Sequence, residues 1–595
     1  MPVVCKNCGA ALKQDATVCP SCGTEVDETA AAVALEYEET EHRPPSETAP
    51  PKKSKKKAII ITSAVAVLLM GFAALAFGMG LFMSDKQRFL YAEYKTFEQL
   101  SEEFQNKYGE DLAFNELTVS NPSRSEVTLS GMLNMDAATY DPDLDMIQTI
   151  LNSSSITMTQ EMDPAVNQAF YELGLNIQQT DALTIEMIQS NEQMGLKVPF
   201  LYDEYFYINL DQYGDFMRMF DPFYDGIESL ESAQYSLEDY KLSEAEQEAL
   251  QSRYSTFFMD SLKDEYFTDN GKVDYEHSDT TLSLRELVLE LSPEEASAFS
   301  NEFFEFVAAD DELHQLIAER IVMTGDAETF DQVMDLEEFN VETIQAEIRD
   351  VFEDLKADAA NLQFPNGFTS TILVDNSNIV VNRQINTAIS TENTNEAGSL
   401  MVETRNVELD TNEVDRAAVI TFAPEGQQDS ELNLAYTNLI GAGDGSRTED
   451  MNLNVSIQEF GTISEPFSLS MQSEFFGLGT GEQQVERTFA VMSNDISSME
   501  PLLTGTLNQE KDVNLKDETA SYKYDFTIDL NDQFENGSLS VVLESDSTII
   551  EEVSLPTLDG DEGINIVELT QMDMMQITQD IEMRLGQLMY ELGLF

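Results

Sequence analysis

Short alternating segments fill most of residues 368–550 and constrain the fold of this chain more than any other feature. Apolar and polar residues alternate in runs such as STILVDN, AAVITFA, LNLAYTNLI, RTFAVMS and GSLSVVLES. A period of two residues is typical of a strand with one buried face, and turn residues such as Asn536-Gly537 separate the runs. The pattern predicts an antiparallel meander of about eight to ten strands.

A helix is predicted in residues 85–109, whose sequence is DKQRFLYAEYKTFEQLSEEFQNKYG. Its apolar residues recur at helical spacing, and Gly109 favours an end of the helix there. The stripe consists of Leu90, Tyr94, Phe97, Phe104 and Tyr108. We expect this stripe to pack into the core of the domain that the helix enters; a partner-binding face is the alternative.

The rest of residues 84–362 mixes strands and helices. Segments such as EVTLSGMLNM and EYFYINL predict half-buried antiparallel strands. A Ser-Pro-Glu-Glu sequence at 292–295 predicts a helix start, and amphipathic patterns predict helices in 213–262, in 328–362 and at the C-terminus. The predicted fold class is therefore multidomain, with two α+β halves, 84–362 and 363–595, built from large curved antiparallel sheets and packed helices. Two unrelated sandwiches would give the same pattern.

An uncharged apolar stretch, AIIITSAVAVLLMGFAALAFGMGLFM, occupies residues 58–83. As a helix, a stretch of this length covers the roughly 30 Å of a bilayer's hydrocarbon core, so it predicts one transmembrane helix. Five lysines in PPKKSKKK directly precede it. By the positive-inside rule, the N-terminus would lie in the cytoplasm and residues 84–595 outside. The predicted location is the cell membrane, with a single pass.

Charge differs sharply on the two sides of this stretch. The chain has a net charge of −79, from 111 Asp or Glu and 32 Lys or Arg, yet residues 1–83 carry 9 of the former and 8 of the latter. Such an acidic remainder repels phosphate backbones, which argues against nucleic-acid binding. It also suggests a saline or alkaline medium outside a halophilic or alkaliphilic bacterium.

Few residues after position 83 suit catalysis. No cysteine lies there, and the only histidines are His277 and His314, for which we expect surface roles. Asp141, Asp143 and Asp145 have the alternate spacing of a calcium loop, but Met146 replaces the glycine of that loop. Together with LDGDEG at 558–563, this segment is more typical of an acidic surface turn. We predict no catalytic residues and no enzymatic activity.

All four cysteines lie in CKNCGAALKQDATVCPSCG near the N-terminus. Two Cys-x-x-Cys pairs ten residues apart can place four thiolates around one tetrahedral zinc ion, so Cys5, Cys8, Cys19 and Cys22 are predicted structural zinc ligands. A disulfide is disfavoured on the reducing side of a membrane, and a redox dithiol lacks its βαβ context.

These residues resemble the short bacterial zinc ribbon, through C-x-x-C-G-A-x-L followed by A-x-x-C-P-x-C-G-T. A ribbon in 1–26, a flexible acidic and Lys-rich linker in 27–57 and a span in 58–83 are together similar to a largely uncharacterised family of membrane-anchored zinc-ribbon proteins of Gram-positive bacteria. The ribbon has only Lys6 and Lys13 against several carboxylates, so protein docking or self-association is favoured over nucleic-acid binding.

From these features we predict a non-enzymatic envelope protein. Its outer region would bind a cell-wall, lipid or protein ligand, and its ribbon would bind a cytoplasmic partner. The alternatives are an extracytoplasmic hydrolase that uses carboxylates and a self-associating scaffold.

Overall fold

The computed structural model describes two short strands near the N-terminus and most of the chain from Met83 onward. Its gaps after that residue are 136–141, 178–179, 231–241, 325–339, 392–393, 410–412, 425–429, 444, 460–461, 494–500, 532–535, 559–561 and 592–595. The chain divides into two compact units, Met1–Ala58 and Ile59–Phe595. In the first unit, β1 (Val3–Val4) pairs antiparallel with β2 (Ala11–Leu12).

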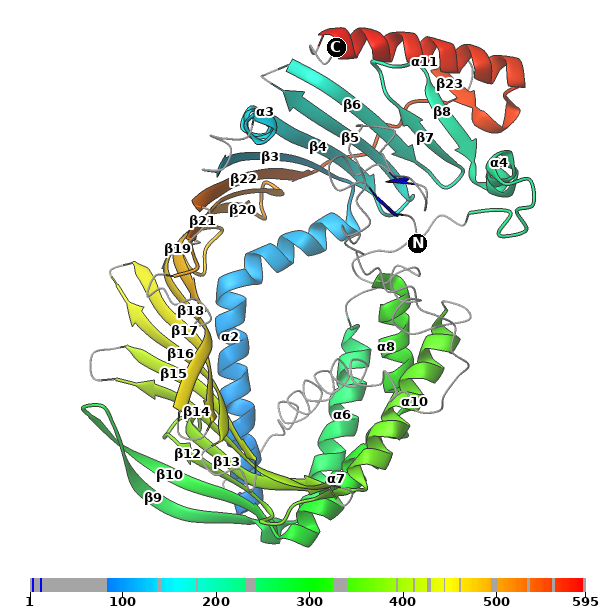
Figure 1. Cartoon of the computed structure of the whole chain (residues 1–595). Coiled ribbons are helices and arrows are strands. Elements are labelled where there is room, and N and C mark those ends of the chain that lie inside the picture. Colours follow the sequence, from blue (N-terminus) through cyan, green and yellow to red (C-terminus); the bar gives the residue numbers. More distant parts are fainter. Residues whose placement is uncertain are drawn as a thin grey trace. The chain divides into compact units, whose positions relative to one another are not determined.

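In the second unit, the strands from β3 to β23 belong to one strongly curved sheet (Figure 1). These strands are β3 (Ser123–Met135), β4 (Ser154–Asp163), β5 (Gln168–Ile177), β6 (Thr180–Gln189), β7 (Gln193–Lys197), β8 (Tyr205–Asn209), β9 (Phe267–His277), β10 (Thr280–Leu291), β11 (Leu362–Gln363), β12 (Phe368–Val374), β13 (Val380–Thr391), β14 (Thr394–Glu408), β15 (Val414–Pro424), β16 (Glu431–Ala442), β17 (Ser446–Glu459), β18 (Thr462–Phe476), β19 (Glu482–Met492), β20 (Leu503–Asn514), β21 (Thr519–Asn531), β22 (Asn536–Ile549) and β23 (Gly563–Asn565).

From β12 to β22, each strand pairs antiparallel with the next strand of the chain, so the predicted meander is confirmed, with eleven strands where we expected eight to ten. Two ladders then connect distant parts of the sequence. β10 pairs with β12, and β22 pairs with β3, where Val541 lies opposite Gly131. The sheet continues through β3–β8, and β23 adds a parallel strand beside β8.

The predicted fold class is therefore wrong. We expected α+β halves with separate sheets in 84–362 and 363–595, whereas the β10–β12 and β22–β3 ladders unite strands of both ranges in one large, mostly-β sheet. Alternation decides which face of a strand a residue occupies, but it does not decide which strand is the neighbour.

Eight helices of the described chain accompany the sheet: α2 (Asp85–Ser120), α3 (Pro142–Leu151), α4 (Tyr213–Phe220), α6 (Glu244–Ser261), α7 (Pro293–Ala308), α8 (Asp311–Thr324), α10 (Val341–Ala359) and α11 (Gln571–Glu591). The predicted helix start at 292–295 is confirmed, because Ser292 and Glu295 form a capping box at the start of α7. None of the helices in the described part of the chain is apolar and long enough to cross a membrane. Except for Met83, the apolar stretch 58–83 lies outside the described residues.

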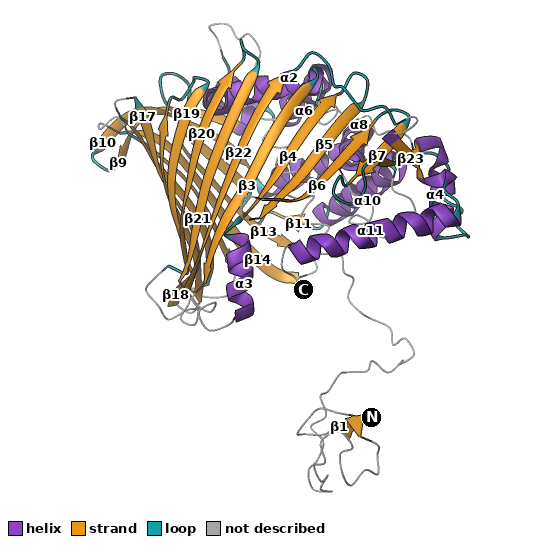
Figure 2. Cartoon of the chain, turned by 90° about the horizontal axis from the view of Figure 1, so that it is seen from above, coloured by secondary structure: helices purple, strands orange, loops and turns teal. Residues whose placement is uncertain are grey.

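The main hydrophobic core is built from α6, α7, α8 and α10 together with β10 and β12, and α7 lies at the β12 end of the sheet (Figure 1). Figure 2 shows α6, α8 and α10 on the concave side of the sheet. Phe258 of α6, Ile344 of α10 and Ile372 of β12 are completely buried. The stripe predicted in 328–362 supplies part of this core, since Ile344 and Ile348 of α10 are both buried. The core therefore holds these helices against one end of the sheet.

Candidate ligand-binding site

Helix α2 runs along the concave face of the sheet, crossing successive strands (Figure 1). Four ion pairs follow one another along it and join it to β13, β15, β17 and β20. They are Glu93–Arg383, Glu103–Arg416, Lys107–Glu449 and Asp111–Lys511. Because residues three and four apart share one side of a helix, Glu103, Lys107 and Asp111 form one charged face. The sheet is therefore contacted by the polar side of α2.

The apolar stripe of α2 lies beside this charged face and is largely exposed. Phe97, Phe104 and Tyr108 have exposed fractions of 46%, 51% and 42%, and only Leu90, near the start of the helix, is buried. The prediction that the whole stripe packs into a core is therefore wrong. Ion pairing of the charged face to the sheet leaves the aromatic side chains free of that contact.

A cavity of about 810 Å³ lies where α2 passes between the sheet and the helical core. It is lined mainly by apolar side chains of α2, α6, α7 and β10–β16. They include Phe97, Leu100, Phe299, Phe304, Ala418 and Tyr436. A volume of this size, with mostly apolar walls and a few polar groups, is typical of small-molecule sites.

Two arginines and one carboxylate supply the charged groups of the cavity: Arg383, Arg416 and Glu93. Arg405 also borders the cavity, but its side chain pairs with Asp415 on the opposite face of the sheet. Burial raises the pKa of Glu93 above its ordinary range, although the Arg383 guanidinium opposes the shift. At Glu103, burial also opposes ionisation, but Arg416 and Arg447 outweigh it and hold the pKa of that carboxyl below its ordinary range. The Nε atom of Arg383 is buried and has no acceptor among the described residues.

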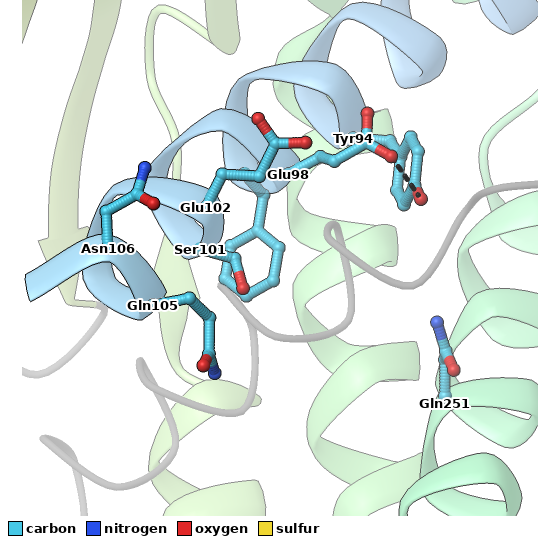
Figure 3. A pocket seen from close by; sticks show the side chains of 8 residues that line it. Tyr94, Glu98, Ser101, Glu102, Gln105, Asn106 and Gln251 are labelled. Atoms are coloured by element: carbon cyan, nitrogen blue, oxygen red, sulfur yellow. Dashed lines mark hydrogen bonds between the residues drawn. The ribbon is translucent and has the colours of Figure 1, made fainter. Parts of the chain in front are cut away.

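A second hollow, of about 550 Å³, lies on the other side of α2, toward Gln251 of α6 (Figure 3). Its walls are mostly polar and include Glu98, Glu102, Gln105 and Asn106. The Tyr94 hydroxyl donates a hydrogen bond to Glu98, with 3.3 Å between the oxygens. With two carboxylates and no cation among its lining residues, this hollow is chemically unlike the apolar cavity, with which it shares Phe97.

The predicted zinc ligands Cys5, Cys8, Cys19 and Cys22 lie outside the described residues. The ladder of β1 and β2 pairs Val4 with Ala11, and the chain between these strands contains Cys5 and Cys8. Such a pairing on either side of a Cys-x-x-Cys sequence suits a ribbon hairpin. Within the described part of the chain, no group of three His, Cys, Asp or Glu side chains could hold a metal ion.

The acidic segment with Asp141, Asp143 and Asp145, for which we expected a surface turn instead of a calcium loop, is helical in part. Asp141 lies outside the described residues, whereas Asp145 belongs to α3. A calcium loop of this type needs irregular backbone from its first ligand onward, so a helix over these positions does not fit it.

Both histidines after residue 83 have structural partners. His314 is completely buried, donates a hydrogen bond from Nε2 to the Val307 carbonyl at 2.9 Å and stacks on Phe352, so the predicted surface role is wrong for it. Burial lowers the pKa of His314, which favours the neutral ring. His277 lies 2.7 Å from the carboxylate of Asp415.

Sequence reasoning missed the cationic side chains of the cavity. Arg383 and Arg416 lie in the alternating runs NIVVNRQI and EVDRAAV, at positions whose neighbours two residues away are apolar or small. A basic residue on the inward face of a strand, in a chain this acidic, is the signal that could have found them.

Comparisons with known proteins identify a zinc-ribbon domain in residues 4–26. Among curated proteins, none matches this chain. Similar solved structures include OpdQ of Pseudomonas aeruginosa, which is 6% identical, with 72% of this chain and 98% of that chain covered and a TM-score of 0.21. The outer membrane protein OpdK of the same organism is 8% identical, with 72% and 98% coverage and a TM-score of 0.19. The monoaromatic hydrocarbon channel CymD is 7% identical, with 75% and 93% coverage and a TM-score of 0.17.

These findings correct the predicted location and function. We expected a single-pass cell-membrane protein with residues 84–595 outside, a protein partner at the ribbon and a further ligand outside. In the described chain no helix could cross a membrane, and the strands of both predicted halves belong to one large sheet. Hydropathy of one stretch dominated that prediction, whereas the described chain places its apolar residues on alternate positions of many strands. At TM-scores near 0.2, no activity of those proteins is transferred to this chain.

Proposed function

We propose that the second unit is a binding protein, and not an enzyme, for an amphipathic small molecule with an apolar body and an anionic group. The cavity of about 810 Å³ between α2, the helical core and the sheet carries this proposal. Its aromatic and aliphatic walls favour an apolar body, because burial of apolar surface stabilises a complex by about 25 cal/mol per Å².

The arginines of the cavity indicate that the ligand carries an anionic group. In a chain with a net charge of −79, two arginines, Arg383 and Arg416, face one cavity. A guanidinium has five donors, and Glu93 occupies only part of the Arg383 fork, whose buried Nε has no acceptor among the described residues. A ligand carboxylate or phosphate placed between Arg383 and Arg416 would complete these hydrogen bonds.

Filling the cavity is expected to abolish binding of a fluorescent long-chain carboxylate. Ala418 lines the cavity from β15, and Ala418→Phe would occupy the space that a ligand needs. We expect the affinity for cis-parinaric acid, measured by fluorescence titration of the full chain, to fall about tenfold or more, as expected for loss of a well-packed apolar contact.

The matched control is Ala435→Phe. Ala435 belongs to the neighbouring strand β16 and lies opposite Val419 of β15. Because Val419 follows Ala418 directly, Val419 and Ala435 lie on the other face of the sheet from Ala418. Its replacement should leave the affinity unchanged. Equal binding by Ala418→Phe and the natural protein would exclude the cavity as the site.

We also propose that residues 1–26 form the zinc-ribbon unit, followed by a linker in 27–57, and that Cys5, Cys8, Cys19 and Cys22 hold one zinc ion. The matched zinc-ribbon domain and the β1–β2 hairpin support this proposal. Zinc bound by four thiolates would stabilise the fold of this unit and leave no open position for catalysis.

Removing one thiolate is expected to lower zinc binding. Cys22→Ser should reduce the zinc content of the purified full chain from about one ion per chain to well below half, by elemental analysis. Ser21→Ala, one residue away, is the control and should retain the metal. Full zinc content in Cys22→Ser would contradict the four-thiolate site.

A further inference from the structure

We infer that the cavity is one end of a longer apolar track that binds the alkyl chains of an amphiphile along the concave face of the sheet. This inference rests on the proposed function and names the class of ligand. Arg383, Arg416 and Glu449 contact α2, so residues at even steps from them on the same strands also face the concave side.

Cross-strand pairs then define a continuous row beside the helix. Ile385 lies opposite Val402, Val402 opposite Ile420, Ile420 opposite Leu434, and Leu434 opposite Val455. On the three strands that form an ion pair with α2, the row residue lies an even number of positions from the paired residue: Ile385 from Arg383, Ile420 from Arg416 and Val455 from Glu449. We call this row and its continuation the apolar lane.

The lane continues through β18–β22. Leu469 of β18 lies opposite Leu453, two residues before Val455 on β17, and opposite Val491 of β19. Val491 lies opposite Leu503, which lies opposite Leu530 of β21. Two residues before Leu530, Ile528 lies opposite Leu539 of β22. Lys511 of β20, which pairs with Asp111 of α2, is an even number of residues from Leu503 and confirms the inward face. Every strand from β13 to β22 therefore places an apolar side chain in the lane.

The lane is accessible, although an apolar sheet face is normally covered. Ile420, Leu434 and Leu539 have exposed fractions of 41%, 39% and 40%. The exposed stripe of α2 stands beside it: Phe97 lines the cavity together with Ile385, and Phe104 follows two turns later on the same side of the helix. The lane and the α2 stripe therefore both leave apolar surface exposed on the concave side of the sheet.

Its length fits extended chains. Neighbouring strands lie about 4.8 Å apart, so the lane from β13 to β22 runs for about 40 Å. Alkyl tails fill one leaflet of a bilayer core of about 30 Å, or about 15 Å each, so the lane can hold more than one tail length. The cavity, with its arginines, lies at one end of it.

The chemistry of the lane selects an alkyl chain as its occupant. The row contains no charged residue, and the backbone groups of these strands are already paired within the sheet. A protein segment would gain no backbone hydrogen bond there, whereas an alkyl chain needs none. The lane is continuous with the cavity, and the cavity arginines complement an anionic group. We therefore expect one amphiphile to place its anionic group in the cavity and its alkyl chain in the lane.

Photolabelling of the full chain tests this inference. Two probes are used, hexadecanoic acid and octanoic acid, each with a diazirine near the methyl end, and labelled peptides are identified by mass spectrometry. In the natural protein, we expect the short probe to label the cavity and the long probe to label β16–β20 as well. Leu434→Asp should reduce lane labelling by about tenfold, because a charge in apolar surroundings is costly.

Leu439→Asp is the matched control. Leu439 lies on the same strand as Leu434, on the opposite face, and its exposed fraction of 39% is equal. This variant should label like the natural protein, and Leu434→Asp should keep its cavity labelling by the short probe.

Three outcomes would overturn the inference. Labelling by the long probe confined to the cavity would leave the proposed function intact and exclude the lane. Lane labelling that is equal in Leu434→Asp and Leu439→Asp would mean non-specific contact. A lane that resists labelling in a chain that runs as a dimer would mean that a second copy covers it. If neither probe labels the cavity, the proposed function itself fails.

Discussion

Replacing Asp111 by leucine is expected to lower the free energy of unfolding by about 3–5 kcal/mol, the usual cost of stranding a buried charge. The Lys511 side chain is only 2% exposed, and its Nζ lies 2.5 Å from Asp111. The Tyr522 hydroxyl donates a second hydrogen bond to the same carboxylate at 2.9 Å. The variant therefore leaves a buried ammonium and a buried hydroxyl with fewer partners. Urea unfolding of the full chain, followed by circular dichroism, measures the loss.

A triple variant separates the stranded groups from lost packing. Asp111→Leu combined with Lys511→Met and Tyr522→Phe removes every polar member of the cluster while keeping similar volume. Replacing a whole buried ion pair by apolar residues is often neutral, so most of the lost stability should return. If the single variant costs less than about 1 kcal/mol, α2 is not held to the sheet by this pair.

How far the sequence could predict the fold is clearest on β3. Alternation correctly placed Val127, Leu129 and Leu133 on one face of a strand. It could not reveal that β22, some four hundred residues later, is the neighbouring strand, because such pairing depends on the path of the whole chain. It also could not show that Leu129 stays 37% exposed on an uncovered face.

On α2, local rules failed for a tertiary reason. Gly109 predicted a helix end, yet α2 continues to Ser120. A glycine inside a helix costs only about 1 kcal/mol, and the contacts of Asp111 and Phe114 with the sheet lie beyond it. The ion pairs between α2 and the sheet also explain why the apolar stripe is exposed, because they turn the charged side of the helix toward the sheet. Amphipathic periodicity identifies two sides and assumes that the apolar one is buried.

Arg383→Met is expected to destabilise the protein by about 3 kcal/mol near neutral pH, since it leaves Glu93 in the cavity wall without its partner. Arg416 also lines the cavity, but the ion pair that it forms is with Glu103. The loss should depend on pH, because burial already raises the pKa of Glu93 in the natural protein. Removal of the guanidinium would raise it further.

The sign of the pH dependence follows from that direction. A carboxyl whose pKa is higher in the folded state than in the unfolded chain stabilises the fold fully below its ordinary value near 4.3, and this contribution is lost as the pH rises through the raised value. The stability difference between the natural protein and Arg383→Met should therefore shrink as the pH falls from 7 toward 4.5. In Glu93→Gln combined with Arg383→Met, no carboxylate is stranded, so the difference should be small and nearly independent of pH. Urea unfolding across this range, with all other carboxylates common to the three proteins, measures both trends. A difference that stays constant in Arg383→Met would mean that Glu93 is not the group whose charge Arg383 compensates.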